Sequence, residues 1–265
     1  MKVKQKDYII QTLLIAISLL TIGVLLWIIT YIFINGIAHI DLIKLFPPMV
    51  ATLYIVVLGL MISAPIGIGA AIYLHEYAKE GRFVRIIRFA TESLAAVPSI
   101  LFGLFGMIFI QTQLKLGFSM VSGALTVSMM VLPTLVKATE EALKTVPNSY
   151  REGSLALGAT KYATIAKVIL PTALPGILTG VVLGIGRIVG ETAAIYLTAG
   201  TMYRLPQHAM ESGRTLAVHL YLLAKEGISF DEAYGTALAL LVVILCLNLT
   251  TYFIGSKLNI SNRSK

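Results

Sequence analysis

Apolar residues dominate the chain in six long runs that are separated by polar segments. An α-helix needs about 20 predominantly apolar residues to cross the hydrocarbon core of a bilayer, and the six runs are of roughly that length or longer. The pattern therefore predicts an all-α membrane protein with six transmembrane helices in a single domain, residues 1–265. The predicted spans are Tyr8–Ile34, Met49–Leu74, Phe89–Gln111, Met120–Val136, Ile169–Ala199 and Gly235–Gly255.

The first run begins close to the N-terminus, where a secretory signal would also lie. A signal has an apolar core of only about 7–15 residues, followed by small residues at a cleavage site. The segment Tyr8–Ile34 is longer than that and lacks such a site. We therefore expect it to be a retained transmembrane helix.

The composition and the placement of charge agree with a membrane location. The chain is 57% hydrophobic and 13% charged, whereas soluble domains carry about 25% charged residues. Its net charge of +8 does not indicate nucleic-acid binding, because the basic residues alternate between loops instead of forming one face. Loops on one side hold fifteen of the 21 Lys and Arg residues and those on the other hold five, with Arg187 inside a span. Since basic loops stay in the cytoplasm, both termini and loops 75–88 and 137–167 are predicted to be cytoplasmic.

Helix start signals are densest in the polar stretch Pro147–Pro171, between the fourth and fifth runs. Ser149 and Glu152 have the spacing of a capping box, in which each side chain accepts a hydrogen bond from the backbone N–H of the other. The pattern predicts a short helix over Ser149–Leu157.

Signals for the end of that helix and the start of the next one follow directly. Gly158 is suited to a left-handed helix end, and Thr160 is suited to the N-cap of a helix that continues from Lys161 into the membrane. A short, capped, exposed helix between two membrane spans is typical of a docking element for another protein.

The same stretch resembles the cytoplasmic loop of importer-type ABC permeases, which reads E-A-A, three residues, Gly, nine residues, I-x-L-P. Here Glu152-Gly153-Ser154 is followed at those distances by Gly158 and by Val168-Ile169-Leu170-Pro171. Gly153 and Ser154 stand where the motif has two alanines, and Val168 stands where it has Ile. Small residues thus replace small ones, and an aliphatic residue replaces an aliphatic one. The resemblance implies a coupling helix that receives force from an ATPase, and the alternative is an ordinary loop helix without a partner. The residues it implies for ATPase coupling are Ser149, Arg151, Glu152 and Gly158.

Two charged residues lie inside the fifth run, Arg187 and Glu191. They are four residues apart and would share one face of a helix. A charge in the bilayer core is unfavourable unless it is paired or faces water. One interpretation is a mutual ion pair that fixes helix packing. The other is that Arg187 faces a translocation path and attracts an oxyanion through its planar guanidinium, with Glu191 keeping the ligand from binding too tightly.

A second polar group interrupts the third run, between Glu92 and Ser99. Pro98 frees a backbone carbonyl, and Ser99 can hydrogen-bond that carbonyl or contact a ligand. We favour a proline kink with a solvated Glu92 at the membrane edge, and keep Ser99 as a candidate residue of the substrate pathway.

These two stretches resemble the permease subunits of phosphate-specific ABC importers, the PstA type. The similarity is carried by Ala96-Val97-Pro98-Ser99-Ile100 with Gly103, and by Gly186-Arg187-Ile188-Val189-Gly190-Glu191-Thr192-Ala193. It extends to the helix count and the chain length. The resemblance implies the ABC importer permease fold, inorganic phosphate as substrate, and half of a translocation pathway. The pathway residues it implies are Arg187, Glu191 and Ser99.

The energy for transport is expected to come from another protein, because the chain has no G-x-x-x-x-G-K-[ST] sequence that would bind ATP. The chain is therefore not expected to be an enzyme. The resemblance implies alternating access, driven by a cytoplasmic ABC ATPase dimer, with a second related permease and an extracytoplasmic phosphate-binding protein. Alternatives are a permease for molybdate, sulfate or phosphonate, a structural membrane scaffold, or a secondary transporter, which should show internal repeats or several paired intramembrane acids.

The long outer segment Gly200–Tyr234 contains an amphipathic piece, Ser212–Gly227, with Leu216, Leu220 and Leu223 on one side. Two interpretations are open. The piece contacts the binding protein, as the resemblance implies for this side, or it lies on the membrane or over its own bundle.

No cofactor or metal is expected. The four histidines are scattered without metal-ligand spacing. The single cysteine, Cys246, lies inside an apolar run and cannot form an internal disulfide.

Overall fold

Helices are the regular secondary structure of the residues that the structure describes. The computed structural model describes the backbone of residues 2–263 and the side chains of residues 8–253. Five helices are long and apolar enough to cross a membrane, and a bent helix pair makes a sixth span if its two halves cross together. The all-α fold class of a multi-pass membrane protein is thereby confirmed, with five or six spans. The spans are α1 (Lys2–Gly36), α2 (Leu42–Ile72), the pair α3 (Arg82–Ala95) and α4 (Ser99–Phe105), α5 (Met120–Lys144), α8 (Leu170–Val189) and α11 (Phe230–Arg263).

Shorter helices and π-helical segments connect or extend these spans. The short helices are η1 (Ile37–His39), α6 (Asn148–Ala156), α7 (Lys161–Thr164), α9 (Ala193–Thr198) and α10 (Leu216–Lys225). The π-helical segments are η2 (Tyr73–Tyr77), η3 (Gly106–Gln113) and η4 (Ile165–Ile169).

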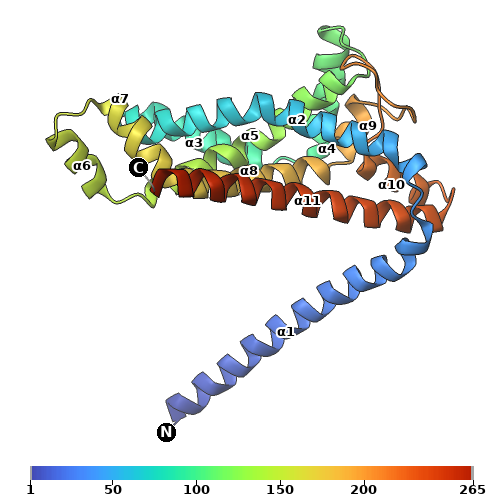
Figure 1. The fold of residues 1–265 in the computed structure, drawn as a ribbon, viewed down its shortest axis with the longest axis horizontal. Coiled ribbons are helices and arrows are strands. Elements are labelled where there is room, and N and C mark those ends of the chain that lie inside the picture. The colour runs from blue at the N-terminus through green and yellow to red at the C-terminus, as the bar shows by residue number, and fades with distance from the viewer. Residues whose placement is uncertain (1, 264–265) are drawn as a thin grey trace.

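The long helices α2, α5, α8 and α11 run along one direction, with α6 and α7 at one end and α9 and α10 at the other (Figure 1). The first helix, α1, leaves the bundle at an angle, and its apolar side chains are exposed. The start of α1 and the end of α11 both lie toward the end that carries α6 (Figure 1). The basic side chains of the two terminal segments, which entered the charge count, lie outside the described side chains.

The core forms around α5, which packs between α2 and α8. Small residues let α5 and α8 approach closely: a Cβ added to Gly176 or Gly180 would lie 2.6 Å from the Cβ of Ala142 or Ala138. Such contacts between small residues are how helices associate in a bilayer, where the solvent is as apolar as the side chains. The largest fully buried side chains of the central cluster are Ile55, Met120, Met130, Leu135, Ile188 and Ile195.

The third span is not the continuous helix that the sequence predicts over Phe89–Gln111. It begins earlier, at Arg82, and its two halves meet at an angle of 101°. Pro98 lies at the break in an extended conformation, with φ −58° and ψ 138°. A proline has no N–H to donate and excludes the preceding residue from helical geometry, so the backbone turns here more sharply than at an ordinary kink.

The fifth span also has other bounds than predicted. Its helix starts at Lys161 and ends at Val189, and Pro171 lies inside it. The wider π-helical turn η4 comes directly before this proline, and such local adjustments relieve the backbone around a membrane proline. The predicted continuation to Ala199 is wrong, because the chain leaves the helix after Val189 and begins α9 separately.

The outer segment contains α10, which packs on its own bundle. Thr215 accepts a hydrogen bond from the backbone N–H of Val218 and caps the helix, whose buried side chains include Leu216 and Leu222. The hydroxyl of Thr52 on α2 accepts a further bond from the N–H of Leu216, 2.9 Å away. Of the two interpretations of this piece, coverage of its own bundle is confirmed.

Candidate functional site

The short helix predicted over Ser149–Leu157 is present as α6, but it starts differently. It begins at Asn148, with Pro147 at the N-cap and no side-chain capping bond. The predicted capping box of Ser149 and Glu152 is therefore wrong. The carbonyl of Pro147 accepts the N–H of Tyr150 and closes the first turn, so the fixed proline backbone starts the helix.

The end of α6 and the start of the next helix are as predicted. Gly158 has φ +83°, the left-handed conformation that glycine adopts at little cost. Its N–H donates to the carbonyl of Leu155, 2.9 Å away. The hydroxyl of Thr160 accepts the N–H of Ala163 and caps α7.

The outer face of α6 carries exposed apolar side chains at the end of the bundle. Tyr150 and Leu155 are each 49% exposed, and Leu157 just after the helix is 91% exposed. Ser149 and Glu152 are also exposed. A cluster of exposed apolar residues with a polar rim is typical of a protein-interaction site.

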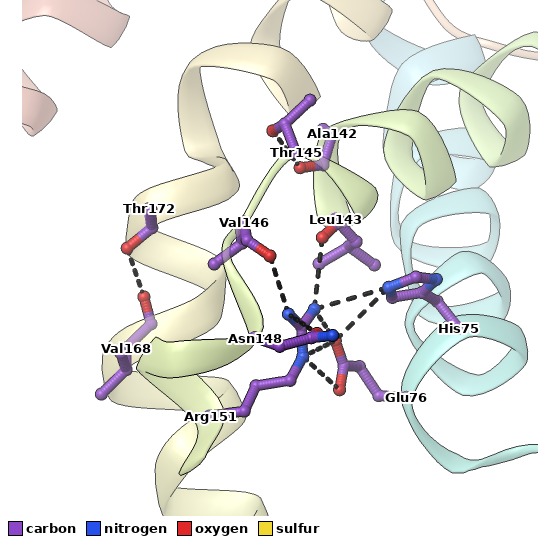
Figure 2. Close-up of polar contacts among 10 residues, drawn as sticks. All are labelled: His75, Glu76, Ala142, Leu143, Thr145, Val146, Asn148, Arg151, Val168 and Thr172. Atoms are coloured by element: carbon purple, nitrogen blue, oxygen red, sulfur yellow. Dashed lines mark hydrogen bonds and ion pairs between the residues drawn. The ribbon is translucent and has the colours of Figure 1, made fainter. Parts of the chain in front are cut away.

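Arg151 points away from this surface and into the protein (Figure 2). Its guanidinium forms an ion pair of 2.7 Å with Glu76, which lies in η2 at the end of α2. It also donates to the carbonyls of Val146, at 2.9 Å, and Leu143, at 3.2 Å. Only 18% of the Arg151 side chain and 7% of the Glu76 side chain are exposed. Sequence reasoning missed Glu76, because no local pattern links two positions 75 residues apart.

At the other candidate site, Arg187 and Glu191 do not share a helical face. Arg187 lies in the last turn of α8, and Glu191 lies beyond the end of that helix. Glu191 is buried, and its carboxylate accepts the N–H of Ala194 at 3.0 Å, at the start of α9. The predicted ion pair between them is wrong. Among the side chains that the structure describes, none forms a hydrogen bond or ion pair with Arg187.

Arg187 lies on an open face of α8. Leu183, one turn earlier, is 57% exposed, and Gly190 is also exposed. A Cβ added to Gly186 would meet nothing within 4 Å. The opposite face is buried in the core through Ile185 and Ile188. Arg187, which has no hydrogen-bond or ion-pair partner among the described side chains, therefore lies beside this open face in the last turn of α8.

Ser99 is the first residue of α4, directly after the break at Pro98. The two short helices α4 and α9 pack side by side, with Gly103 facing Ala194 and Gly106 facing Thr198. A Cβ on Gly103 would lie 2.8 Å from the Cα of Ala194. The structure thus brings the helix that Ser99 starts against the helix that follows Glu191.

The short helix α9 is held at both ends by buried side chains. Glu191 accepts an N–H at its start, and the side-chain amide of Gln111 donates to the carbonyls of Leu197 and Thr198 at its end, at 2.7 and 2.8 Å. Irregular backbone at membrane depth is tolerated only where protein buries it or it lines a water-filled cavity. Sequence reasoning used Gln111 only as the end of a span, although a buried amide in an apolar run was a signal for such a role.

The fold defines the class of protein: a multi-pass membrane domain with a short exposed helix, α6, at one end of the bundle and a membrane helix, α8, that ends just after Arg187. Residues 63–259 match the family described as "Binding-protein-dependent transport system inner membrane component". The chain belongs to this family, and it is the permease subunit of a binding-protein-dependent ABC importer.

Relatives and solved structures agree with the family. The chain is 33% identical over 219 residues to the "Probable ABC transporter permease protein YqgI" of Bacillus subtilis, covering 77% of this chain and 74% of that protein. It is 36% identical over 199 residues to the "Phosphate transport system permease protein PstA 1" of Mycobacterium tuberculosis, covering 73% and 64%. A chain of a bacterial alginate ABC transporter, solved with its pentasaccharide-bound periplasmic protein, shares the fold with a TM-score of 0.72 at 15% identity, covering 96% of both chains.

Proposed function

We propose that this permease serves an ATP-driven importer of inorganic phosphate and forms half of its translocation pathway. The observation that carries the proposal is the unpaired guanidinium of Arg187 on the open face of α8. An uncompensated charge at membrane depth is unfavourable unless water or a ligand compensates it. Several relatives are named as phosphate transport permeases of the PstA type, which favours phosphate as that ligand.

The chemistry of the pathway suits an oxyanion. A guanidinium binds phosphate through two parallel N–H···O bonds, with geometric selection as well as charge attraction. The carboxylate of Glu191 lies on the other side of the break, fixed to the start of α9. It lowers the positive potential near Arg187, which keeps an anion from being held too tightly to leave. Ser99, the first residue of α4, is a further candidate residue of the pathway.

The partners follow from the surfaces that the chain leaves open. An ABC ATPase dimer docks on the exposed face of α6 around Glu152 and Leu155. A second, related permease lies along the open face of α8 and completes the pathway. A phosphate-binding protein delivers the substrate at the opposite end, near α10. Both termini and α6 lie in the cytoplasm, as the distribution of basic residues predicts.

In the proposed mechanism, ATP closes the two ATPase subunits, and each of them moves a coupling helix. The membrane helices then open toward the binding protein, phosphate enters at the level of Arg187, and hydrolysis returns the helices to the inward-open state. The permease itself makes and breaks no covalent bond.

The test is uptake of radiolabelled phosphate by proteoliposomes that contain the chain, the ATPase, the second permease and the binding protein. We expect uptake that requires ATP and is suppressed by excess unlabelled phosphate, but not by equal excess of sulfate, molybdate or phosphonate. Stronger competition by one of those anions would assign the pathway to it. Uptake by the chain alone, without ATPase, would show a secondary transporter.

A further inference from the structure

The interior contacts of Arg151 join three elements at the cytoplasmic end of the bundle (Figure 2). The residue belongs to α6, its ion-pair partner Glu76 lies in η2 at the end of α2, and it bonds to the carbonyls of Leu143, in the last turn of α5, and of Val146, just beyond that helix. The carbonyl of Leu143 also accepts the N–H of Val146, so Arg151 adds a further donor where α5 ends. A single side chain thus fixes α6 to the ends of two core helices.

Two further contacts close this arrangement through α7. The hydroxyls of Ser154 on α6 and Thr164 on α7 are hydrogen-bonded at 2.9 Å. The ammonium of Lys161, at the start of α7, lies 5.0 Å from the centre of the Tyr77 ring, next to Glu76. Segments α6, α7 and η2 are therefore joined pairwise, which resists rotation of α6 about any one contact.

The partner helix α2 leads from this junction to the transport site. From Glu76 to Gly59 the helix covers about 25 Å at 1.5 Å per residue. A Cβ on Gly59 would lie 3.3 Å from the Cδ1 of Ile188, the neighbour of Arg187 in α8. A displacement of the end of α2 is therefore delivered directly to the turn that carries Arg187.

We propose that Arg151 and Glu76 are the positioning pair that transmits movement of the coupling helix to α2 and thereby to the transport site. This inference rests on the proposed function, since it presupposes that an ATPase moves α6. Arg151 does not meet the ATPase itself: its side chain points inward, while Glu152, Leu155 and Leu157 form the exposed surface. Loss of the pair leaves that surface intact and removes only its connection to α2.

The choice of an ion pair suits this role. A buried ion pair contributes little net stability, because the loss of hydration offsets the attraction of the charges. Its value lies in fixing geometry, since neither charge can separate from the other without remaining uncompensated inside the protein. Arg151 adds directional bonds to two carbonyls, so the angle of α6 to α5 and α2 is fixed as well as the distance.

The experiment measures phosphate uptake and ATP hydrolysis together in proteoliposomes containing the complete importer. For Glu76→Gln and Arg151→Ala we expect hydrolysis within about twofold of wild type and uptake reduced about tenfold, so that each imported phosphate uses about ten times more ATP. Arg151→Lys keeps the positive charge but loses the planar, forked guanidinium. Its ratio of ATP hydrolysed to phosphate imported should lie between those of wild type and Arg151→Ala. The matched control is Lys144→Gln, which breaks an exposed ion pair of 2.7 Å with Glu141 within α5; its ratio should equal wild type.

A merely structural role would lower uptake and hydrolysis in parallel, with an unchanged ratio, and that result would overturn the proposal. An unchanged ratio with full uptake in Glu76→Gln would overturn it too. If phosphate is not the substrate, the wild-type importer itself does not take it up, which distinguishes this outcome from failure of the pair. The ratio of ATP hydrolysed to substrate imported is then measured with the oxyanion that is imported, and it still tests the pair.

Discussion

Two arginines in two regions of the molecule have opposite surroundings. Arg151, at the end of the bundle that carries α6, meets a carboxylate and two carbonyls that are already in place. Arg187, in the last turn of a membrane helix, has no such partner among the described side chains and borders free space. Both are charges largely removed from bulk water, where an unpaired charge is costly. Under the proposed function, the first arginine holds elements of the protein together and the second meets a ligand.

The two sites differ in the number of helices and helical segments that converge at the arginine. The end of α5, the end of η2 and the start of α6 meet around Arg151, and helix ends bring unpaired carbonyls with them. Around Arg187 the neighbouring residues are glycines, and the helix stops after Val189. Small residues and a break create space, whereas converging helix ends fill it. The same side-chain type thus has different surroundings in the two regions, in keeping with the two different roles that we propose for it.

The largest effect is expected from Arg187→Ala, which removes the open cation. Uptake should fall about 100-fold, the order lost when a charged group forfeits its hydrogen bonds to an anion. Uptake by Arg187→Lys should fall less, because lysine retains a positive point charge. Uptake assays in proteoliposomes measure this, with Arg85→Ala, an exposed arginine on α3, as the control that stays near wild type. Normal uptake by Arg187→Ala would contradict the binding role.

The packing that creates the open region can be broken at Gly103. A valine there would force α9 away from α4, because even a Cβ comes within 2.8 Å of the Cα of Ala194. Overpacking of this kind costs about 1–3 kcal/mol. A lower thermal midpoint and a lower yield of monodisperse protein in detergent would report it. In Gly153→Val, on α6, the added Cβ meets nothing within 4 Å and should be tolerated; equal losses in both variants would argue against the packing explanation.

A cysteine placed at Ser99 can report movement of the membrane helices, and so distinguish the role proposed for Arg187 from that proposed for Arg151. In a Cys246→Ser background, Ser99→Cys should react with a small thiol reagent at a rate that changes several-fold when ATP is added. That response should survive in Arg187→Ala, where the helices still move, and disappear in Arg151→Ala, where movement is not passed on. Identical responses in the two variants would remove the distinction between them. The rate of modification, followed by mass spectrometry, is the measurement.

The smallest effect is expected around a third arginine, Arg214. It makes fewer polar contacts than Arg151, whereas Arg187 makes none with the described side chains. Arg214 donates to the carbonyl of Thr201 at 2.9 Å and lies 3.3 Å from His219 and over the ring of Tyr203. Burial, with a further contribution from Arg214, lowers the pKa of His219 from 6.5 to about 4.

The sign of the resulting pH dependence follows from this pKa. Between pH 6.5 and 4 the unfolded chain binds a proton at His219 that the folded chain does not, so the folded state loses stability as the pH falls through this window and is most stable above it. We expect the thermal midpoint to drop between pH 7.5 and 5, and the drop to be smaller in His219→Gln. An equal drop in both proteins would exclude His219 as its source.

The local sequence determined much of the region around α6 and α7. The spacing around Glu152 and Gly158 indicated a coupling helix, and the left-handed turn at Gly158 and the cap at Thr160 are in place. Turns and caps depend on a few neighbouring residues, so a linear pattern is enough to specify them. Where a competing local signal was present, the prediction was wrong: Pro147 starts α6 in place of the Ser149 capping box.

Other features of the transport region were decided by packing. Apolar length predicts that a run can cross a bilayer, but not that α3 and α4 meet at 101° or that the last turn of α8 leaves one face open. These depend on which glycines of one element face which residues of another.

The sequence by itself determined six apolar runs long enough to span a membrane, a polar stretch with the spacing of a coupling loop, and two charges in an apolar segment. Each of these follows from the type and the spacing of residues that are close together in the chain. Only the tertiary structure decided that Arg151 pairs with Glu76, that Glu191 turns to the start of α9, and that Arg187 has no partner among the described side chains. Whether a buried charge is paired depends on residues far apart in the chain, and folding alone brings those together.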